Sequence, residues 1–97
     1  MILATVSTDP GFHSDVRATL DGRFRFEEVW DISHDEAARL HGVKCDQKCL
    51  TVIDFSAQTQ ALPLARTLSG RPQITSIALN CGDSRDELLL LGVWFKS

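Results

Sequence analysis

The run from Cys49 to Ser56, CLTVIDFS, constrains the fold of this chain more than any other stretch. Its residues are mostly apolar or β-branched, and a carboxylate, Asp54, comes near its end. A continuous apolar run of this length between helical patterns predicts a central parallel strand that is buried on both faces. The carboxyl ends of such strands face the ligand crevice of an open α/β sheet. The sequence therefore predicts that Asp54 lies where folds of this kind place their functional groups.

Strand-like and helix-like patterns alternate along the rest of the chain. We expect strands at residues 2–6, 23–30, 49–55 and 74–79, with a fifth beginning at 93–95, and helices at 10–20, 33–41, 63–69 and 84–91. Alternation of this kind requires a parallel sheet with helices on both faces, joined by right-handed crossovers. The chain of 97 residues allows one such domain.

Local signals support several of these elements. Asp9 is expected to cap the first helix and Pro10 to occupy its first position. Ser33 and Glu36 form a capping-box pattern at the second helix. Pro63 is expected to open the third helix rather than to interrupt it. The alternation of charged and apolar residues in 23–26, RFRF, predicts an edge strand with one solvent-exposed face.

Charge and cysteine content exclude several function classes. The formal net charge is −3 and no two basic residues are adjacent, so we expect no nucleic-acid partner for this segment. No apolar run reaches about 18 residues, which argues against a membrane span, and the N-terminus lacks the basic leader of a signal peptide. Three irregularly spaced cysteines do not suit a disulfide framework. We expect a reduced, cytoplasmic domain.

In their order and spacing, the motifs resemble the receiver domain of two-component response regulators. The resemblance rests on the 2–6 strand, Asp9-Pro10, Val52-Ile53-Asp54, the 77–80 segment IALN and the 91–94 segment LGVW. It implies a flavodoxin-like, doubly wound α/β fold with strand order 2-1-3-4-(5). It also implies that residues 1–97 form a receiver-like domain whose last β-α unit is missing or incomplete, truncated before the fifth helix.

The resemblance also implies a chemistry for Asp54. In receivers, a histidine kinase donates a phosphoryl group to the aspartate that ends the third strand, which corresponds to Asp54. The aspartate attacks phosphorus and forms an acyl phosphate. An acidic pair after the first strand holds Mg²⁺, a Ser or Thr at the end of the fourth strand binds phosphoryl oxygens, and a Lys at the end of the fifth strand adds positive charge.

This chain departs from that pattern. The acidic-pair positions fall on Ser7 and Thr8, the switch position falls on Asn80, and the lysine position corresponds nominally to Lys96. Neutral hydroxyls replace two hard Mg²⁺ ligands, so we expect weak or absent Mg²⁺ binding and no other cofactor. The resulting hypothesis is a degenerate receiver that is not an enzyme and that acts through protein partners, such as a histidine kinase or another signalling protein.

The short C-terminus gives a further expectation. Without a fifth helix, apolar surface is exposed and the fourth strand becomes an edge of the sheet. We therefore expect either a fragment of a longer protein or a homodimer or higher oligomer.

Two other functions remain open at this stage. One is a competent receiver that is phosphorylated on Asp54, and the other is a small flavodoxin-like enzyme or nucleotide-binding unit. The second is disfavoured because residues 7–11, STDPG, contain one glycine and make no Gly-rich phosphate loop.

Minor candidates have structural alternatives that we favour. His34, His41, Cys45 and Cys49 are loosely spaced for zinc, and we interpret the cysteines as buried or loop thiols. Cys81 is a weak candidate for a reactive thiol. A Leu-rich stretch at 88–91 predicts a packed helix, or else a partner surface.

Overall fold

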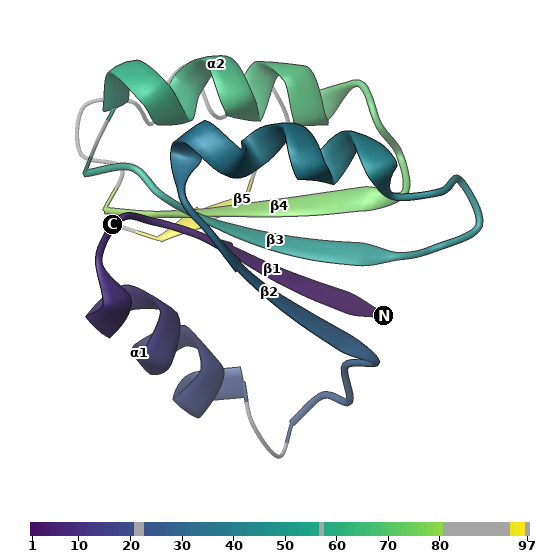
Figure 1. Cartoon of the computed structure of the whole chain (residues 1–97), viewed down its shortest axis with the longest axis horizontal. Helices are drawn as coiled ribbons and strands as arrows, with labels where there is room; N and C mark the ends of the chain where they lie inside the picture. The colour runs from purple at the N-terminus through teal and green to yellow at the C-terminus, as the bar shows by residue number, and fades with distance from the viewer. Residues whose placement is uncertain (21–22, 57, 81–93, 97) are drawn as a thin grey trace.

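The structure, a computed structural model, describes residues 1–20, 23–56, 58–80 and 94–96. Five parallel strands form one sheet in the order β2-β1-β3-β4-β5 (Figure 1). The strands are β1 (Ile2–Val6), β2 (Glu28–Ile32), β3 (Cys49–Asp54), β4 (Ile74–Leu79) and β5 (Trp94–Lys96). The predicted α/β class and the parallel strand order 2-1-3-4 are confirmed.

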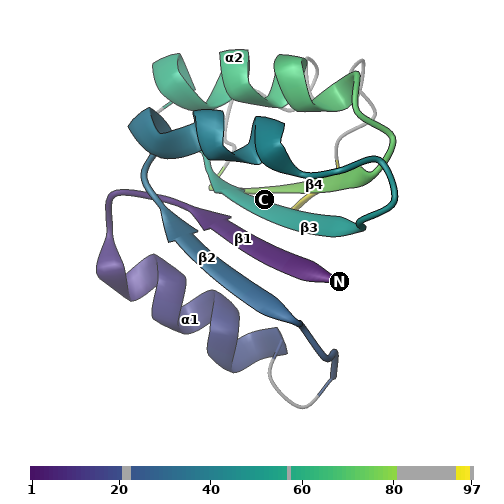
Figure 2. The same cartoon turned by 45° about the vertical axis from the view of Figure 1, so that its right-hand side comes forward.

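Helices cover both faces of the sheet. Helix α1 (Pro10–Leu20) lies on one face, while the 3₁₀ helix η1 (His34–Gly42) and helix α2 (Gln58–Ser69) lie side by side on the other (Figures 1 and 2). This arrangement follows from right-handed crossovers, because β1 leads to β2 in one direction and β3 leads to β4 in the other. All five residues of β1 are buried as a result.

A hydrophobic cluster fills each face of the sheet. The larger one lies under η1 and α2, where Ala61, Ala65 and Leu68 of α2 are almost completely buried. The small alanine side chains let α2 lie close to the strands. The second cluster lies under α1, where Phe12 and Val16 pack against β1 and β3.

Strand β3 is the central strand that the sequence predicted. It lies between β1 and β4, and five of its six residues are buried. Asp54 is its last residue, so the carboxylate lies at the carboxyl edge of the sheet. The position of Asp54 at the end of a central parallel strand is confirmed.

The expected strand at 23–30 is placed too early. Strand β2 begins at Glu28, and of the RFRF stretch only Phe24 makes an isolated bridge. Phe24 and Phe26 both face a groove beside α1, so their side chains do not alternate between two faces. The alternating sequence reflects exposed arginines between two phenylalanines that pack on the same side.

Two further expectations are corrected. Pro63 lies inside α2, which begins at Gln58, because burial of Ala61, Ala65 and Leu68 outweighs the backbone hydrogen bond that a proline cannot donate. The fourth strand is not an edge, because β5 pairs with its Ile77–Leu79 stretch.

The expected helix at 84–91, with its Leu-rich stretch, lies outside the described residues, as does Cys81. None of the helices in the described part of the chain is long and apolar enough to span a membrane. The carboxyl ends of β1, β3 and β4 meet at one edge of the sheet. The predicted site residues Ser7, Asp54 and Asn80 lie at this edge.

Candidate functional site at the carboxyl edge of the sheet

The Asp54 carboxylate accepts hydrogen bonds on both oxygens. Its Oδ2 accepts from the Ser7 hydroxyl at 2.7 Å, and its Oδ1 accepts from the Ser56 backbone N–H at 3.0 Å and from the Asn80 side-chain amide at 3.1 Å. Asp54 is 6% exposed. We call Ser7, Ser56 and Asn80 the Asp54 donor set, and every donor in it is neutral.

These donors decide the charge of Asp54. Burial favours the neutral acid and raises its pKa, but the hydrogen bonds from Ser56, Ser7 and Asn80 favour the anion. The balance lowers the pKa of Asp54 below its ordinary value of 3.8. Asp54 is therefore an ionised carboxylate at neutral pH.

Ser7 joins the ends of two neighbouring strands. It follows β1 directly, and β1 pairs with β3 in parallel, so their carboxyl ends meet at one edge. Ser7 is 2% exposed. While it donates to Asp54, it accepts from the backbone N–H of Asp9 at 3.0 Å. Ser7 thus fixes both the carboxylate and the turn that leads into α1.

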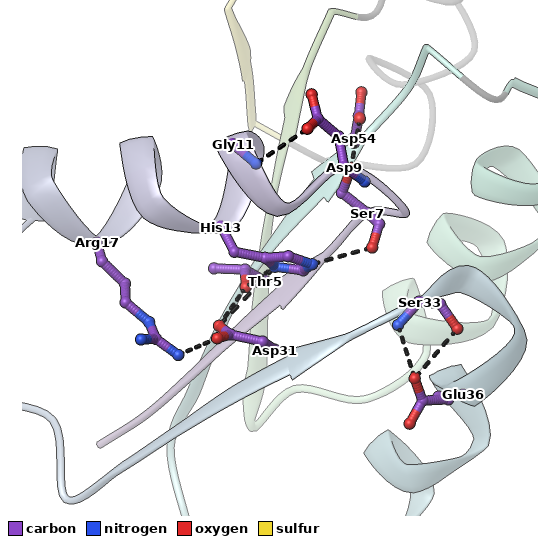
Figure 3. Close-up of polar contacts among 10 residues, drawn as sticks. All are labelled: Thr5, Ser7, Asp9, Gly11, His13, Arg17, Asp31, Ser33, Glu36 and Asp54. Carbon is purple, nitrogen blue, oxygen red and sulfur yellow. Dashed lines mark hydrogen bonds and ion pairs between the residues drawn. The ribbon is translucent and has the colours of Figure 1, made fainter.

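Asp9 acts as a helix cap, as the sequence predicted. Its Oδ1 accepts from the N–H of Gly11 at 2.9 Å, in the first turn of α1 (Figure 3). A carboxylate in this position satisfies an amide that the helix leaves free. Thr8, the second acidic-pair position, is exposed beside it. The nearest acidic residue in sequence is therefore engaged by the backbone of α1.

Asn80 reaches Asp54 from an unusual backbone conformation. Its φ of 59° lies in the left-handed region, which asparagine tolerates better than most other residues. From this turn its amide nitrogen donates to Asp54. The switch position of the resemblance therefore contacts the carboxylate directly, through an N–H donor rather than a hydroxyl.

The backbone of Lys96 ends β5 in the same row of the sheet as Asp54. Lys96 is in register with Leu79 of β4, and Leu79 is in register with Asp54 of β3. The nominal lysine position therefore lies at the same edge, two strands away from the carboxylate.

His34, which the sequence offered only as a loosely spaced zinc candidate, contacts the backbone of Asp54 instead. Its Nε2 bonds the backbone carbonyl of Asp54 at 2.9 Å, and because a carbonyl can only accept, Nε2 carries the hydrogen. The ring is 9% exposed, and its Nδ1 has no partner within the described structure. His34 ties the start of η1 to the tip of β3. Its position after the cap residue Ser33 gives no sequence signal for this contact.

A second polar network joins β1, β2 and α1 (Figure 3). Thr5 donates to Asp31 Oδ1 at 3.0 Å, and Arg17 of α1 pairs with Asp31 Oδ2. His13 contacts the Thr5 hydroxyl through Nδ1 and donates from Nε2 to the backbone carbonyl of Ser7 at 3.0 Å. Through His13 the network binds the backbone carbonyl of Ser7, and no motif or spacing in the sequence predicts it.

The candidate metal ligands do not gather. Cys49 is buried in β3, and Cys45 is exposed in the loop before it. Within the described ranges, no three His, Cys, Asp or Glu side chains are arranged to hold a metal ion. Burial raises the pKa of the Cys49 thiol, which opposes a role as a thiolate ligand.

Comparison of the chain with protein-family models, with curated protein sequences and with solved structures finds no match. The chemistry open to Asp54 must therefore be judged from the groups that surround it.

Proposed function

We propose that the chain is a receiver-like signal-transduction module of a two-component phosphorelay, with a flavodoxin-like fold. In this proposal it is atypical, its Mg²⁺-dependent phosphorylation is impaired, and it acts in the cytoplasm through contacts with a histidine kinase or another signalling protein. The support is the position of an ionised aspartate at the end of the central strand, next to Asn80 and in one row with Lys96.

The observation that carries the proposal is the neutral Asp54 donor set. Mg²⁺ binds hard, preferably anionic oxygens in near-octahedral geometry. Ser7 directs its hydroxyl hydrogen toward Asp54, and Asn80 presents its nitrogen rather than its oxygen. The Asp9 carboxylate bonds Gly11 instead. Among the described residues, the hydrogen bonds that stabilise ionised Asp54 come from neutral donors, which is the arrangement expected of a receiver that works without phosphorylation.

A competent phosphoacceptor receiver is the second candidate. The lowered pKa of Asp54 favours it, because only the ionised carboxylate can attack phosphorus. An oxygen of Asp54 would form the new bond to phosphorus as the bond to the donor's leaving group breaks. Its 6% exposure opposes this candidate, since a donor must reach the carboxylate.

Incubation with Mg²⁺ and acetyl phosphate, followed by intact-mass measurement, separates the two candidates. We expect no phosphoryl adduct, or a small fraction of adduct that disappears in Asp54→Asn. A stoichiometric adduct on the wild-type chain that is lost in Asp54→Asn supports the competent receiver and contradicts impaired phosphorylation. An adduct that persists in Asp54→Asn contradicts both candidates, because the nucleophile then lies elsewhere.

A further inference from the structure

An open groove lies between α1 and the residues that lead into β2, two parts of the chain that are neighbours in Figure 2. It has a volume of about 540 Å³, within the range of about 300–1,000 Å³ that is typical of small-molecule sites. We call it the Arg17–Arg25 groove. Its lining comes from β1, α1, β2 and the residues before β2, and consists of Leu3, Arg17, Ala18, Phe24, Arg25, Phe26 and Val29.

The apolar part of this lining is partly open to solvent. Leu3 is almost completely buried, whereas Phe24 is 49% exposed and Val29 is 41% exposed. The rings of Phe24 and Phe26 lie with their centroids 6.1 Å apart. Single exposed hydrophobic residues are ordinary, but two large ones in one groove indicate a binding surface.

Both charged residues in the lining are arginines. Arg17 is held by an ion pair with Asp31 of β2 (Figure 3), although its side chain is 49% exposed. Arg25 is exposed, and neither a hydrogen bond nor an ion pair joins its side chain to the described part of the chain. The whole chain has a net charge of −3, so a basic groove is not a consequence of its composition.

The two acidic residues that follow in the sequence do not neutralise Arg25. Glu27 lies 3.8 Å from the N-terminal amine. Glu28 is in register with Ile2, whose side chain belongs to the core cluster on the opposite face of the sheet. The positive charge at the groove is therefore open to an anion from outside the chain.

We propose that the Arg17–Arg25 groove binds a small carboxylate with an apolar body, of the class of medium-chain fatty acids. The apolar body lies on Phe24 and Phe26, and the carboxylate lies against Arg25. A guanidinium group suits a carboxylate because it can donate two parallel N–H···O bonds to it. The proposal does not depend on the receiver hypothesis.

The size and the chemistry of the groove favour this class of ligand. A standard protein interface takes about 20–30 residues from each partner, whereas seven residues line this groove. An inorganic anion such as phosphate satisfies the arginines but leaves the exposed Phe24 and Val29 in water. A ligand that has both an apolar body and one carboxylate uses the whole lining.

Three probes that share one alkyl chain and differ in charge test the proposal. Octanoate, octanol and octylammonium are titrated into the full chain, and amide chemical shifts are followed by NMR. We expect octanoate to shift the amides of Ala18, Phe26 and Val29, and to bind about fivefold or more tighter than octanol. Octylammonium binds most weakly because the arginines repel it. Decanoate binds more tightly than octanoate, by about two- to fourfold for each added methylene.

Substitutions separate the contact with the carboxylate from the apolar contact. Arg25→Gln is expected to weaken octanoate about fivefold or more and to leave octanol unchanged. Arg23→Gln is the matched control, because Arg23 is exposed and lies outside the lining. It should change octanoate binding by less than about twofold, since solvent screens its charge. Phe24→Ala should weaken octanoate and octanol alike, because both share the alkyl chain.

Circular dichroism of every variant checks that the fold is retained. Octanoate that does not bind up to its solubility limit, or that binds no more tightly than octanol, overturns the proposal. A loss in Arg23→Gln as large as that in Arg25→Gln overturns it too, as do shifts confined to residues outside the lining. A wild-type dimer in sedimentation equilibrium that Phe24→Ala dissociates, without octanoate binding, also overturns it, because a second copy then occupies the groove.

Discussion

The hydroxyl of Ser7 donates to Oδ2 of Asp54 across 2.7 Å and joins the end of β1 to the end of β3. Both residues are almost completely buried, at 2% and 6% exposure. A buried carboxylate is costly unless hydrogen bonds or an opposite charge compensate it, and here the compensation comes from neutral donors. The Ser7 contact is one of these neutral donors, and its removal gives the first testable consequence.

Replacing Ser7 with alanine is expected to destabilise the fold. The change removes a donor from a buried anion and an acceptor from the Asp9 backbone N–H. A hydrogen bond to a charged group contributes about 1.5–3 kcal/mol, so we expect a loss of about 2 kcal/mol in the free energy of unfolding, measured in urea. Ser69→Ala is the control, because Ser69 is exposed and bonds the Arg66 carbonyl of its own helix. A Ser7→Ala loss no larger than the control contradicts the stabilising role.

Restoring acidic residues after β1 is expected to create a cation requirement. In Ser7→Asp/Thr8→Asp, an added carboxylate faces Asp54, and the like charges lower the free energy of unfolding. Mg²⁺ relieves this repulsion, and its binding adds about 2.7 kcal/mol at a hundredfold excess over Kd. We expect Mg²⁺ to raise the Tm of this variant and to leave the wild-type Tm nearly unchanged.

The matched control for that experiment is Ser7→Asn/Thr8→Asn, which adds similar volume without charge. Its Tm should not respond to Mg²⁺. The acidic variant should also gain a phosphoryl adduct on Asp54 from acetyl phosphate. If the acidic variant gains neither Mg²⁺ binding nor the adduct, the receiver-like proposal is contradicted. The missing acidic pair is then not the reason why phosphorylation of Asp54 is impaired.

The lowered pKa of Asp54 predicts a pH dependence of stability. The folded-state pKa lies below the ordinary 3.8, so ionised Asp54 stabilises the fold above that value. This stability is lost as the pH falls through the folded-state pKa. The difference in free energy of unfolding between wild type and Asp54→Asn should be constant above about pH 5 and change in more acidic solution. Parallel curves down to the acid unfolding transition contradict a lowered pKa.

The sequence was sufficient to place Asp54, and the resemblance drew attention to Ser7 and Asn80, which both donate to it, but the sequence did not predict the contacts of His34 and Asp31. A strand that is covered on both faces must be apolar along its length, so β3 could be recognised in the sequence as a continuous apolar run. The end of that run placed Asp54 at the carboxyl end of the strand. The contacts of His34 and of Asp31 depend on which loops and strands become neighbours. No spacing in the sequence encodes that choice. The RFRF stretch was misassigned because exposed arginines between packed phenylalanines imitate the alternation of a strand.

His34 is expected to contribute to stability through the backbone of Asp54. Its Nε2–H satisfies the Asp54 carbonyl, which lies at the end of the central strand. Alanine leaves that carbonyl without its donor and removes a buried ring, so we expect a loss of about 2 kcal/mol in the free energy of unfolding. His41→Ala, at an exposed position of η1, should change it by less than about 0.5 kcal/mol. Equal effects of the two substitutions contradict a specific role for His34.

Replacing Pro63 with alanine is expected to stabilise the fold, unlike the substitutions of Ser7 and His34. Pro63 is exposed and sits in the sixth position of α2, where its ring nitrogen cannot donate to the Thr59 carbonyl. Pro63→Ala restores that hydrogen bond and adds helix propensity, although it also increases the entropy of the unfolded chain. We expect a net gain of about 1 kcal/mol in the free energy of unfolding. Gln60→Ala, on the exposed surface of the same helix, controls for propensity alone. A Pro63→Ala gain that does not exceed the Gln60→Ala gain means that the helix already accommodates the proline without loss.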